Sequence, residues 1–126
     1  IGYEIGKILD KETIFSERVG GEFVLRRDFE IKENSKVLIV EDVITTGKSS
    51  IECSKLIKDS NATLVGYACI IDRTNGKSDI KDKIISQIQL KIPTYSEEDL
   101  PEDLLKIKAT KPGSRNLKWD RDWELI

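Results

Sequence analysis

One thirteen-residue stretch constrains the fold of this chain more than any other, and it runs from Val37 to Ser49. It begins with the continuous apolar run Val37–Val40, which is typical of a strand covered on both faces, as in a parallel sheet. Glu41 and Asp42 follow at the carboxyl end of that run. Because ligands of open α/β sheets bind at this edge, we expect the two acids to face a substrate.

The acids are followed by a polar turn, Thr45–Ser49, that leads into an expected helix over residues 49–59. Gly47 can adopt the positive φ that a tight turn needs, and Ser49 is the expected N-cap of the helix. Backbone N–H groups of such a turn, at the positive end of a helix, bind phosphate. The stretch therefore predicts a phosphate site next to two carboxylates.

The residues Gly47–Ser50 resemble the end of a nucleotide-binding P-loop, but the spacing excludes that motif. A P-loop has a glycine five residues before its Gly-Lys pair, and this chain has Asp42 there. Adjacent carboxylates instead accept hydrogen bonds from the vicinal hydroxyls of a polyol. Two acids beside a cradle for one phosphate indicate a site for ribose 5-phosphate.

The stretch Val37–Ser49 resembles the signature of the type I phosphoribosyltransferases, which bind phosphoribosyl pyrophosphate. Other segments make the chain similar to the orotate phosphoribosyltransferases in particular. They are Phe15–Arg18, Leu25–Arg27, Ile71–Arg73 and Lys111–Arg115. The resemblance covers residues 1–115 and implies an α/β fold: a mainly parallel, Rossmann-like sheet flanked by helices, with a flexible β-hairpin-like loop.

The resemblance implies transfer of ribose 5-phosphate from phosphoribosyl pyrophosphate to orotate, giving orotidine 5′-phosphate and pyrophosphate in de novo pyrimidine biosynthesis. Glu41 and Asp42 are then the catalytic residues, because carboxylates favour a ribose that becomes cationic. Mg²⁺ is the implied cofactor, carried by substrate and water oxygens, with no protein ligand assigned. The residues implied to bind phosphoribosyl pyrophosphate are Glu41, Asp42, Val43, Ile44, Thr45, Thr46, Gly47, Lys48 and Ser49.

Arginines supply the remaining expected contacts. Arg73 follows a second apolar run at the same sheet edge, and its planar fork of donors fits the orotate carboxylate, with Thr45 helping to position the base. A salt bridge to the edge acids is the alternative for Arg73. Arg18, Arg26 and Arg27 are candidates for contacting pyrophosphate, or else form a solvated hairpin face. The lysine and histidine of the mobile loop in better-known family members have no counterparts here.

Composition excludes several classes of function. A net charge of −2 implies neither a nucleic-acid nor a membrane partner, and the apolar runs are too short to span a bilayer, so we expect a cytoplasmic protein. The absence of histidine excludes a His-containing zinc site and His-dependent catalysis. Cys53 and Cys69 lie in apolar segments and are expected to be buried free thiols. The resemblance implies a homodimer.

We expect residues 1–95 to form the phosphoribosyltransferase core and residues 96–126 a C-terminal helical extension that packs on the same domain. Ile1, Ile5 and Ile8 follow helical spacing, so a helix over 1–9 is predicted. In the family this helix follows a strand and a pyrophosphate-binding loop, so the core is expected to be N-terminally incomplete. Strands are predicted over 13–16, 23–25, 37–40, 64–71 and 88–92, and short helices after Ser96 and around Trp119 and Trp123.

Two alternatives to an orotate enzyme stay open. The first is a phosphoribosyltransferase-like binding or regulatory protein that senses phosphoribosyl pyrophosphate or a nucleotide without turnover. The second is an enzyme of the same superfamily that acts on a purine base. A purine enzyme is expected to stack the base on an aromatic side chain near Asp72, where this chain has Arg73.

Overall fold

The computed structural model describes residues 1–26, 28–93 and 95–108, which fall into two compact units, 1–92 and 93–126. The first unit contains α1 (Gly2–Leu9), β1 (Ser16–Val19), β2 (Glu22–Leu25), β3 (Lys36–Ile44), α2 (Lys48–Asp59), β4 (Thr63–Asp72) and β5 (Ile84–Gln89). Over its described residues, the second unit contains the 3-10 helix η1 (Glu97–Asp99) and α3 (Glu102–Leu105).

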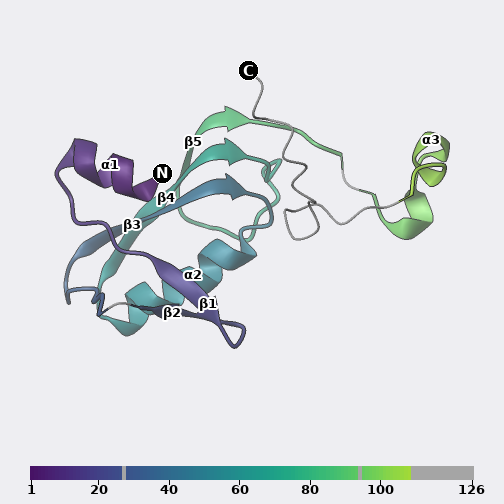
Figure 1. Cartoon of the computed structure of the whole chain (residues 1–126). Coiled ribbons are helices and arrows are strands. Elements are labelled where there is room, and N and C mark those ends of the chain that lie inside the picture. Colours follow the sequence, from purple (N-terminus) through teal and green to yellow (C-terminus); the bar gives the residue numbers. More distant parts are fainter. Residues whose placement is uncertain (27, 94, 109–126) are drawn as a thin grey trace, which may run out of the picture. The chain divides into compact units, whose positions relative to one another are not determined.

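A parallel three-stranded sheet forms the centre of the first unit (Figure 1). Its order is β3-β4-β5, so β4 is the middle strand and pairs in parallel with both neighbours. The helix α2 connects β3 to β4 and contacts both, while the antiparallel hairpin β1–β2 lies against α2. This arrangement confirms the predicted α/β fold with a parallel sheet flanked by helices and a separate hairpin.

The helix α2 forms where the sequence predicts it, and one of its faces is buried. Ser50, Ser54 and Ile57 are the buried positions, and their spacing of four and three residues follows a single helical stripe. Ile57 is 2% exposed, and burying an isoleucine side chain to that extent contributes roughly 1.5–3 kcal/mol. Ser54 Oγ donates to the Ile51 carbonyl at 2.7 Å, which satisfies the hydroxyl inside this interface.

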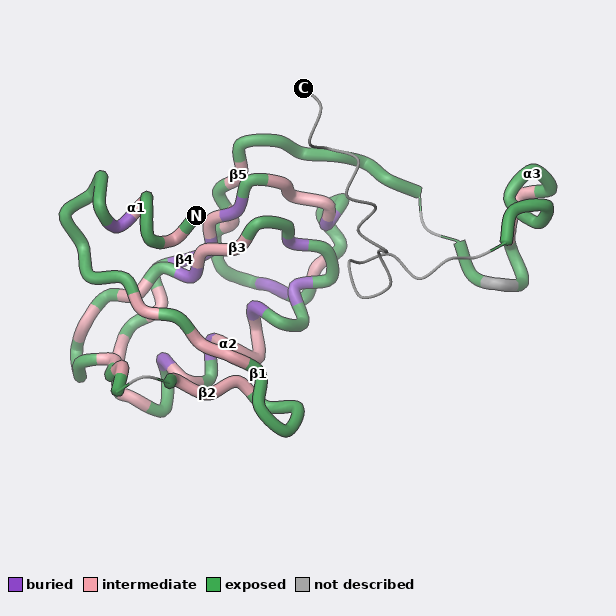
Figure 2. The backbone as a smooth tube through the Cα atoms, viewed as in Figure 1, coloured by how far each residue is buried: buried purple, intermediate pink, exposed green. Residues whose placement is uncertain are grey.

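The hydrophobic core lies between the sheet and α2, and it extends into the connection between β4 and β5 (Figure 2). Its buried members are Ile39, Ile44, Ile57, Tyr67, Cys69 and Ile80. Burial raises the pKa of the Tyr67 hydroxyl and of the thiols of Cys53 and Cys69. Both cysteines are free as predicted, although Cys53 is only half-buried.

The predicted strands at either side of the core have shifted bounds. The first was placed at 13–16, but β1 starts at Ser16 because antiparallel pairing begins directly at the Gly20–Gly21 turn, where Val19 faces Glu22. The last was placed at 88–92, but β5 starts at Ile84 opposite Tyr67 and ends when β4 ends at Asp72. The alternation from Ile88 to Ile92 was misleading, since pairing with β4 decides where β5 lies.

The helix predicted over 1–9 is confirmed as α1, whereas the region after Ser96 forms two short helical pieces separated at Pro101. Three predictions fall outside the described residues: the contact by Arg27, the element Lys111–Arg115 and the helix at Trp119 and Trp123. That residues 96–126 pack on the core stays a prediction. Among the helices that the structure describes, none has the length and apolar character required to cross a bilayer.

Candidate functional site

The predicted thirteen-residue stretch forms a pocket of about 250 Å³. Ten consecutive residues line it: Glu41, Asp42, Val43, Ile44, Thr45, Thr46, Gly47, Lys48, Ser49 and Ser50. They comprise the end of β3, the turn after it and the first residues of α2. The structure therefore brings both acids and the polar turn to one place, at the carboxyl end of a parallel strand.

The two acids are part of β3, which continues past the predicted end at Val40 to Ile44. Consecutive strand residues point to opposite faces, so Glu41 and Asp42 approach the pocket from different directions. Glu41 faces α2, where its Oε1 accepts a hydrogen bond from Ser50 Oγ at 3.5 Å. Asp42 is exposed, and its Oδ1 accepts the Val43 backbone N–H at 2.7 Å.

The electrostatics of the two acids differ accordingly. Burial raises the pKa of the Glu41 carboxyl above its ordinary value, the neighbouring charge of Asp42 raises it further, and the hydrogen bond from Ser50 opposes both effects. Burial and the charge of Asp42 disfavour the ionised form of Glu41, so any hydrogen-bond donor or positive charge that enters the pocket stabilises this form. Sugar hydroxyls and a ribose with cationic character supply these two things.

The turn is shaped by Gly47, which has φ 80° and is the N-cap of α2. The prediction that Ser49 is the N-cap was wrong: helix begins at Lys48, and Ser49 lies in its first turn without capping it. Lys48 N–H donates to Thr46 Oγ1 at 3.3 Å, and the first backbone bond of the helix runs from Ile51 to Gly47 at 2.9 Å. The first N–H groups of α2 thus border the pocket, where a helix favours an anion.

Arg73 follows the end of β4, the strand next to β3, but it is not among the residues that line the pocket. Its backbone N–H donates to the Ile44 carbonyl at 2.8 Å, which ties the end of β4 to the end of β3. Its side-chain Nε is buried and has no hydrogen-bond partner in the described structure. A buried, unpaired donor of this kind is costly unless a ligand satisfies it. The alternative of a salt bridge from Arg73 to the edge acids does not form in this structure: ion pairs within the described residues join other side chains.

The hairpin arginines already have partners. Arg18 donates to Glu52 on α2 and to the Gly21 carbonyl, and its guanidinium lies 4.5 Å from the centre of the Phe23 ring. Arg26 pairs with Glu17 at 3.0 Å across the hairpin. Neither arginine lines the pocket. The sequence-based expectation that they contact pyrophosphate therefore stays a prediction.

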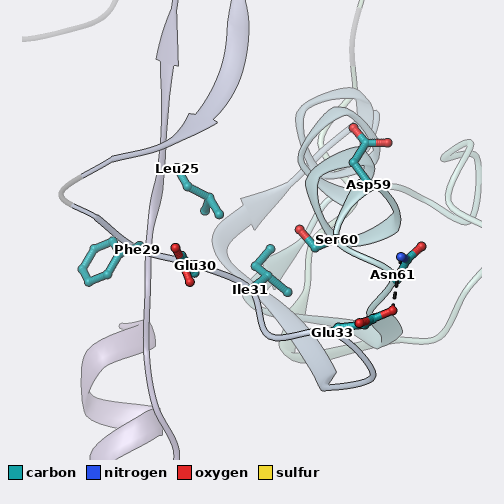
Figure 3. Close-up of a pocket in the computed structure, with 8 residues that line it drawn as sticks. All are labelled: Leu25, Phe29, Glu30, Ile31, Glu33, Asp59, Ser60 and Asn61. Carbon is teal, nitrogen blue, oxygen red and sulfur yellow. Dashed lines mark hydrogen bonds between the residues drawn. The ribbon is translucent and has the colours of Figure 1, made fainter.

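A larger pocket of about 380 Å³ lies elsewhere in the first unit (Figure 3). Its lining residues are Leu25, Phe29, Glu30, Ile31, Glu33, Asp59, Ser60 and Asn61. It is at the C-terminal end of α2, where the helix dipole and the three acids disfavour an anion. Volume alone would select this pocket, but the chemistry of a phosphate site selects the smaller one.

Sequence reasoning missed two residues next to the site. Ser50 bonds Glu41, and Ile80 packs under Gly47 from the β4–β5 connection. The helical spacing of Ser50 and Ser54 was a usable signal for an inward-facing hydroxyl. For Ile80 the only signal was one apolar residue in a charged segment. Among the described residues, no group of three or more His, Cys, Asp or Glu side chains is arranged to hold a metal ion.

Comparison with known proteins agrees with this geometry. Residues 6–98 match the phosphoribosyl transferase domain family. The chain belongs to that family. It is 42% identical over 116 residues to an orotate phosphoribosyltransferase of Maricaulis maris, and 44% identical over 117 residues to one of Caulobacter vibrioides. These alignments cover 92% and 93% of this chain and 60% of each relative, so the chain spans about three fifths of their length.

Solved structures show the same fold as this phosphoribosyltransferase domain. A crystal structure of adenine phosphoribosyltransferase superposes with a TM-score of 0.59 at 20% identity, covering 68% of this chain and 58% of the other. The UMP synthase of Leishmania donovani gives a TM-score of 0.56 at 17% identity, with 70% of this chain and 20% of that one covered. At these identities the likeness establishes the fold alone. The base that accepts the ribose 5-phosphate has to be inferred from the site.

Proposed function

We propose that this phosphoribosyltransferase domain transfers ribose 5-phosphate from phosphoribosyl pyrophosphate to orotate. The observation that carries the proposal is the joint edge of β3 and β4. Here Glu41–Ser50 line a pocket that includes the turn Thr45–Ser49, called the phosphate turn below. Arg73 is tied to Ile44 of this pocket by its backbone N–H, and its buried Nε has no partner among the described residues. The two relatives named above are orotate phosphoribosyltransferases at 42% and 44% identity, which supports orotate as the acceptor.

The first task of the site is to fix the sugar. The N–H groups at the start of α2 and the exposed side chains of Thr45, Thr46 and Lys48 are suited to the 5′-phosphate. Glu41 and Asp42 then accept hydrogen bonds from the ribose hydroxyls. Holding the phosphate and the hydroxyls together leaves C1 of the ribose in a fixed position, so the base attacks without a further search for orientation.

The second task is to favour the charge that develops as pyrophosphate leaves. C1 becomes cationic in the transition state, and the carboxylates of Glu41 and Asp42 stabilise that charge more than they stabilise the neutral sugar. Glu41 gains further, because cationic ribose offsets both its partial burial and the repulsion from Asp42. This difference between ground state and transition state is what accelerates the reaction.

Mg²⁺ is proposed to enter with the substrate. Glu41 and Asp42 line the pocket, and their acceptor oxygens fit the water shell of such an ion, whereas no protein cage is present among the described residues. When bound, the ion supplies neutralisation of the leaving pyrophosphate. Arg18 and Arg26 are proposed as additional pyrophosphate contacts once they leave Glu52 and Glu17.

We further propose that the complete protein is a cytoplasmic homodimer. Large apolar side chains on the neighbouring strands β4 and β5 stay exposed, with Val65 at 51% and Ile85 at 52%. Burial against a second copy would remove such side chains from water. The proposed location follows from the proposed substrates, which are soluble metabolites, and neither nucleic acid nor membrane is a proposed partner.

An assay with competing bases tests the proposed function. Formation of the nucleoside monophosphate is measured with orotate, uracil, hypoxanthine and adenine, each with phosphoribosyl pyrophosphate and Mg²⁺. The proposal predicts product with orotate only. Product with a purine would assign the domain to the purine enzymes, and tight binding of phosphoribosyl pyrophosphate without product from any base would assign it to the binding proteins.

A further inference from the structure

The phosphate turn packs against a side chain from a segment that is distant in the sequence. Ile80 belongs to the connection between β4 and β5, and it is 9% exposed. A Cβ atom placed on Gly47 would lie 2.7 Å from Ile80 Cγ1 and 2.8 Å from Ile80 Cδ1. Gly47 itself is buried, whereas Thr46 and Lys48 on either side of it are exposed. Ile80 therefore contacts the turn from beneath, on the side away from solvent.

The connection that carries Ile80 is held by hydrogen bonds at two points before Ile80, at Thr74 and at Asp79. Near β4, Thr74 is 8% exposed, and its backbone N–H donates to Asp72 Oδ1 at 2.7 Å. The Thr74 hydroxyl oxygen and carbonyl accept the N–H groups of Gly76 and Lys77 at 3.1 and 2.8 Å. Further along, the N–H of Asp79 donates to the Thr46 carbonyl at 3.4 Å. Ile80 is thus held against the turn by a structured segment.

We propose that Ile80 is a positioning residue for the phosphate site, acting through Gly47 without touching the ligand. This role rests on the proposed function, because it assumes that the turn binds the 5′-phosphate. A glycine at φ 80° has many alternative conformations, and the turn would visit them if the space beneath it were empty. By filling that space, Ile80 keeps the turn in the shape that presents its N–H groups to phosphate.

The expected effect follows from the fraction of molecules with a competent turn. An apparent Kd rises in inverse proportion to that fraction, so a turn that is competent about one tenth of the time binds about tenfold more weakly. A role in core packing alone predicts something else. It predicts lower stability with the same affinity in the molecules that stay folded.

The experiment compares Ile80 with a second buried isoleucine. Ile57 is 2% exposed and lies in the last turn of α2, at the end of the helix away from the pocket. Calorimetric titration with ribose 5-phosphate is carried out on the 126-residue chain and on Ile80→Ala, Ile80→Val and Ile57→Ala, well below each melting temperature. We expect Ile80→Ala to bind about tenfold more weakly. Ile80→Val should fall between it and the wild type, and Ile57→Ala should melt earlier yet bind like the wild type.

Four results would overturn the proposal. Wild-type affinity in Ile80→Ala would show that the turn keeps its shape unaided, and an equal loss of affinity in Ile57→Ala would show a general effect of core damage. If Ile80→Ala does not fold, Ile80→Val decides, since it lacks Cδ1, one of the two atoms closest to Gly47; an unchanged Kd there overturns the role. Failure of the wild type to bind ribose 5-phosphate overturns the proposed function itself, and this role with it.

Discussion

The turn Thr45–Ser49 and the hairpin β1–β2 both carry groups expected to meet phosphate, yet they hold those groups by different means. In the turn, the donors are backbone N–H groups whose directions follow from the start of α2 and from Gly47 resting on Ile80. In the hairpin, the donors are arginine side chains, 42% and 55% exposed, that are paired with Glu52 and Glu17. Exposed ion pairs of this kind contribute little to stability.

This difference predicts that substitutions in the two regions have effects of different size. The turn is organised without a ligand, so the phosphate binding proposed there would involve little rearrangement. The arginines of the hairpin have to exchange one partner for another before they can contact pyrophosphate. Substitutions at β3, the turn and Arg73 should therefore have large and specific effects, and substitutions on the hairpin should have small ones.

The largest expected effect is that of Asp42→Asn on turnover. Removing one preorganised charge from a developing cation lowers the rate by about two to three decades, or roughly 3–4 kcal/mol. Steady-state kinetics with orotate measure it, and Asp59→Asn, at the far end of α2, is the matched control. A changed KM with kcat within about threefold of the wild type would mean that Asp42 binds ground state and transition state equally.

Arg73→Ala should weaken orotate binding by roughly 1.5–3 kcal/mol, the range for a lost hydrogen bond to a charged group. Phosphoribosyl pyrophosphate should bind as before, because its proposed contacts lie on the turn, the acids and the hairpin. Titration of each substrate separates the two effects, with Lys32→Ala as the control, because Lys32 pairs with Glu12 and does not line the pocket. Equal losses for both substrates would assign Arg73 to pyrophosphate or to the edge acids.

A pair of glycines separates backbone strain from damage to the site. Gly47 and Gly76 have φ of 80° and 70°, but only Gly47 has Ile80 next to it, while nothing lies within 4 Å of the Cβ position at Gly76. Each Gly→Ala change should cost about 1–2 kcal/mol of stability through the left-handed backbone. Gly47→Ala should cost more than Gly76→Ala, because its Cβ would lie 2.7 Å from Ile80 Cγ1. Only Gly47→Ala should also lose affinity for ribose 5-phosphate. Urea unfolding and calorimetry measure the two quantities, and the same loss of affinity in both variants would contradict this view of the turn.

The smallest expected effects concern two carboxyl groups of opposite pKa shift. Burial first and Asp42 second raise the pKa of Glu41 above 4.5, so its stabilising contribution is present at low pH and is lost as pH rises through its folded pKa. The hydrogen bond from Arg18 lowers the pKa of Glu52 below 4.5, so its contribution is present above that pH and is lost as pH falls.

Urea unfolding over a pH series measures both signs. In Glu41→Gln the free energy of unfolding should fall less steeply than in the wild type as pH rises above 4.5. In Glu52→Gln it should fall less steeply as pH drops below 4.5, while the affinity for ribose 5-phosphate stays within about twofold. Effects of the same sign in the two variants would contradict the environments described for these groups.

The contrast between turn and hairpin also explains what the sequence could predict. The pocket is built from ten consecutive residues, so its chemistry could be inferred from local order alone. The positions of β1 and β5 depend on partners distant in the sequence, and their predicted bounds were wrong by several residues. Ser49 was predicted as the N-cap because serine is a preferred residue at that position. Gly47 is the N-cap instead, because the turn needs a positive φ at the residue before the helix.

Ile80 shows the same limit at the site itself. It stands alone among charged residues in the sequence, and only the folded chain places it under Gly47. The ion pairs of Arg18 and Arg26 could not be predicted from the sequence either. Glu52 is 34 residues from Arg18 in the sequence, and the register of the hairpin brings Glu17 to Arg26. The residues proposed to carry the chemistry could be named from the sequence, whereas the residues that hold them in place could not.

The most direct test is calorimetric titration of the 126-residue chain with ribose 5-phosphate and, separately, with ribose and with inorganic phosphate. The structure predicts saturable binding of ribose 5-phosphate at one site, tighter than binding of either part, because the acids and the turn engage it together. Gly47→Val should abolish this binding. No binding of ribose 5-phosphate by the wild type, or unchanged binding by Gly47→Val, would contradict the assignment of Glu41–Ser50 as the sugar-phosphate site.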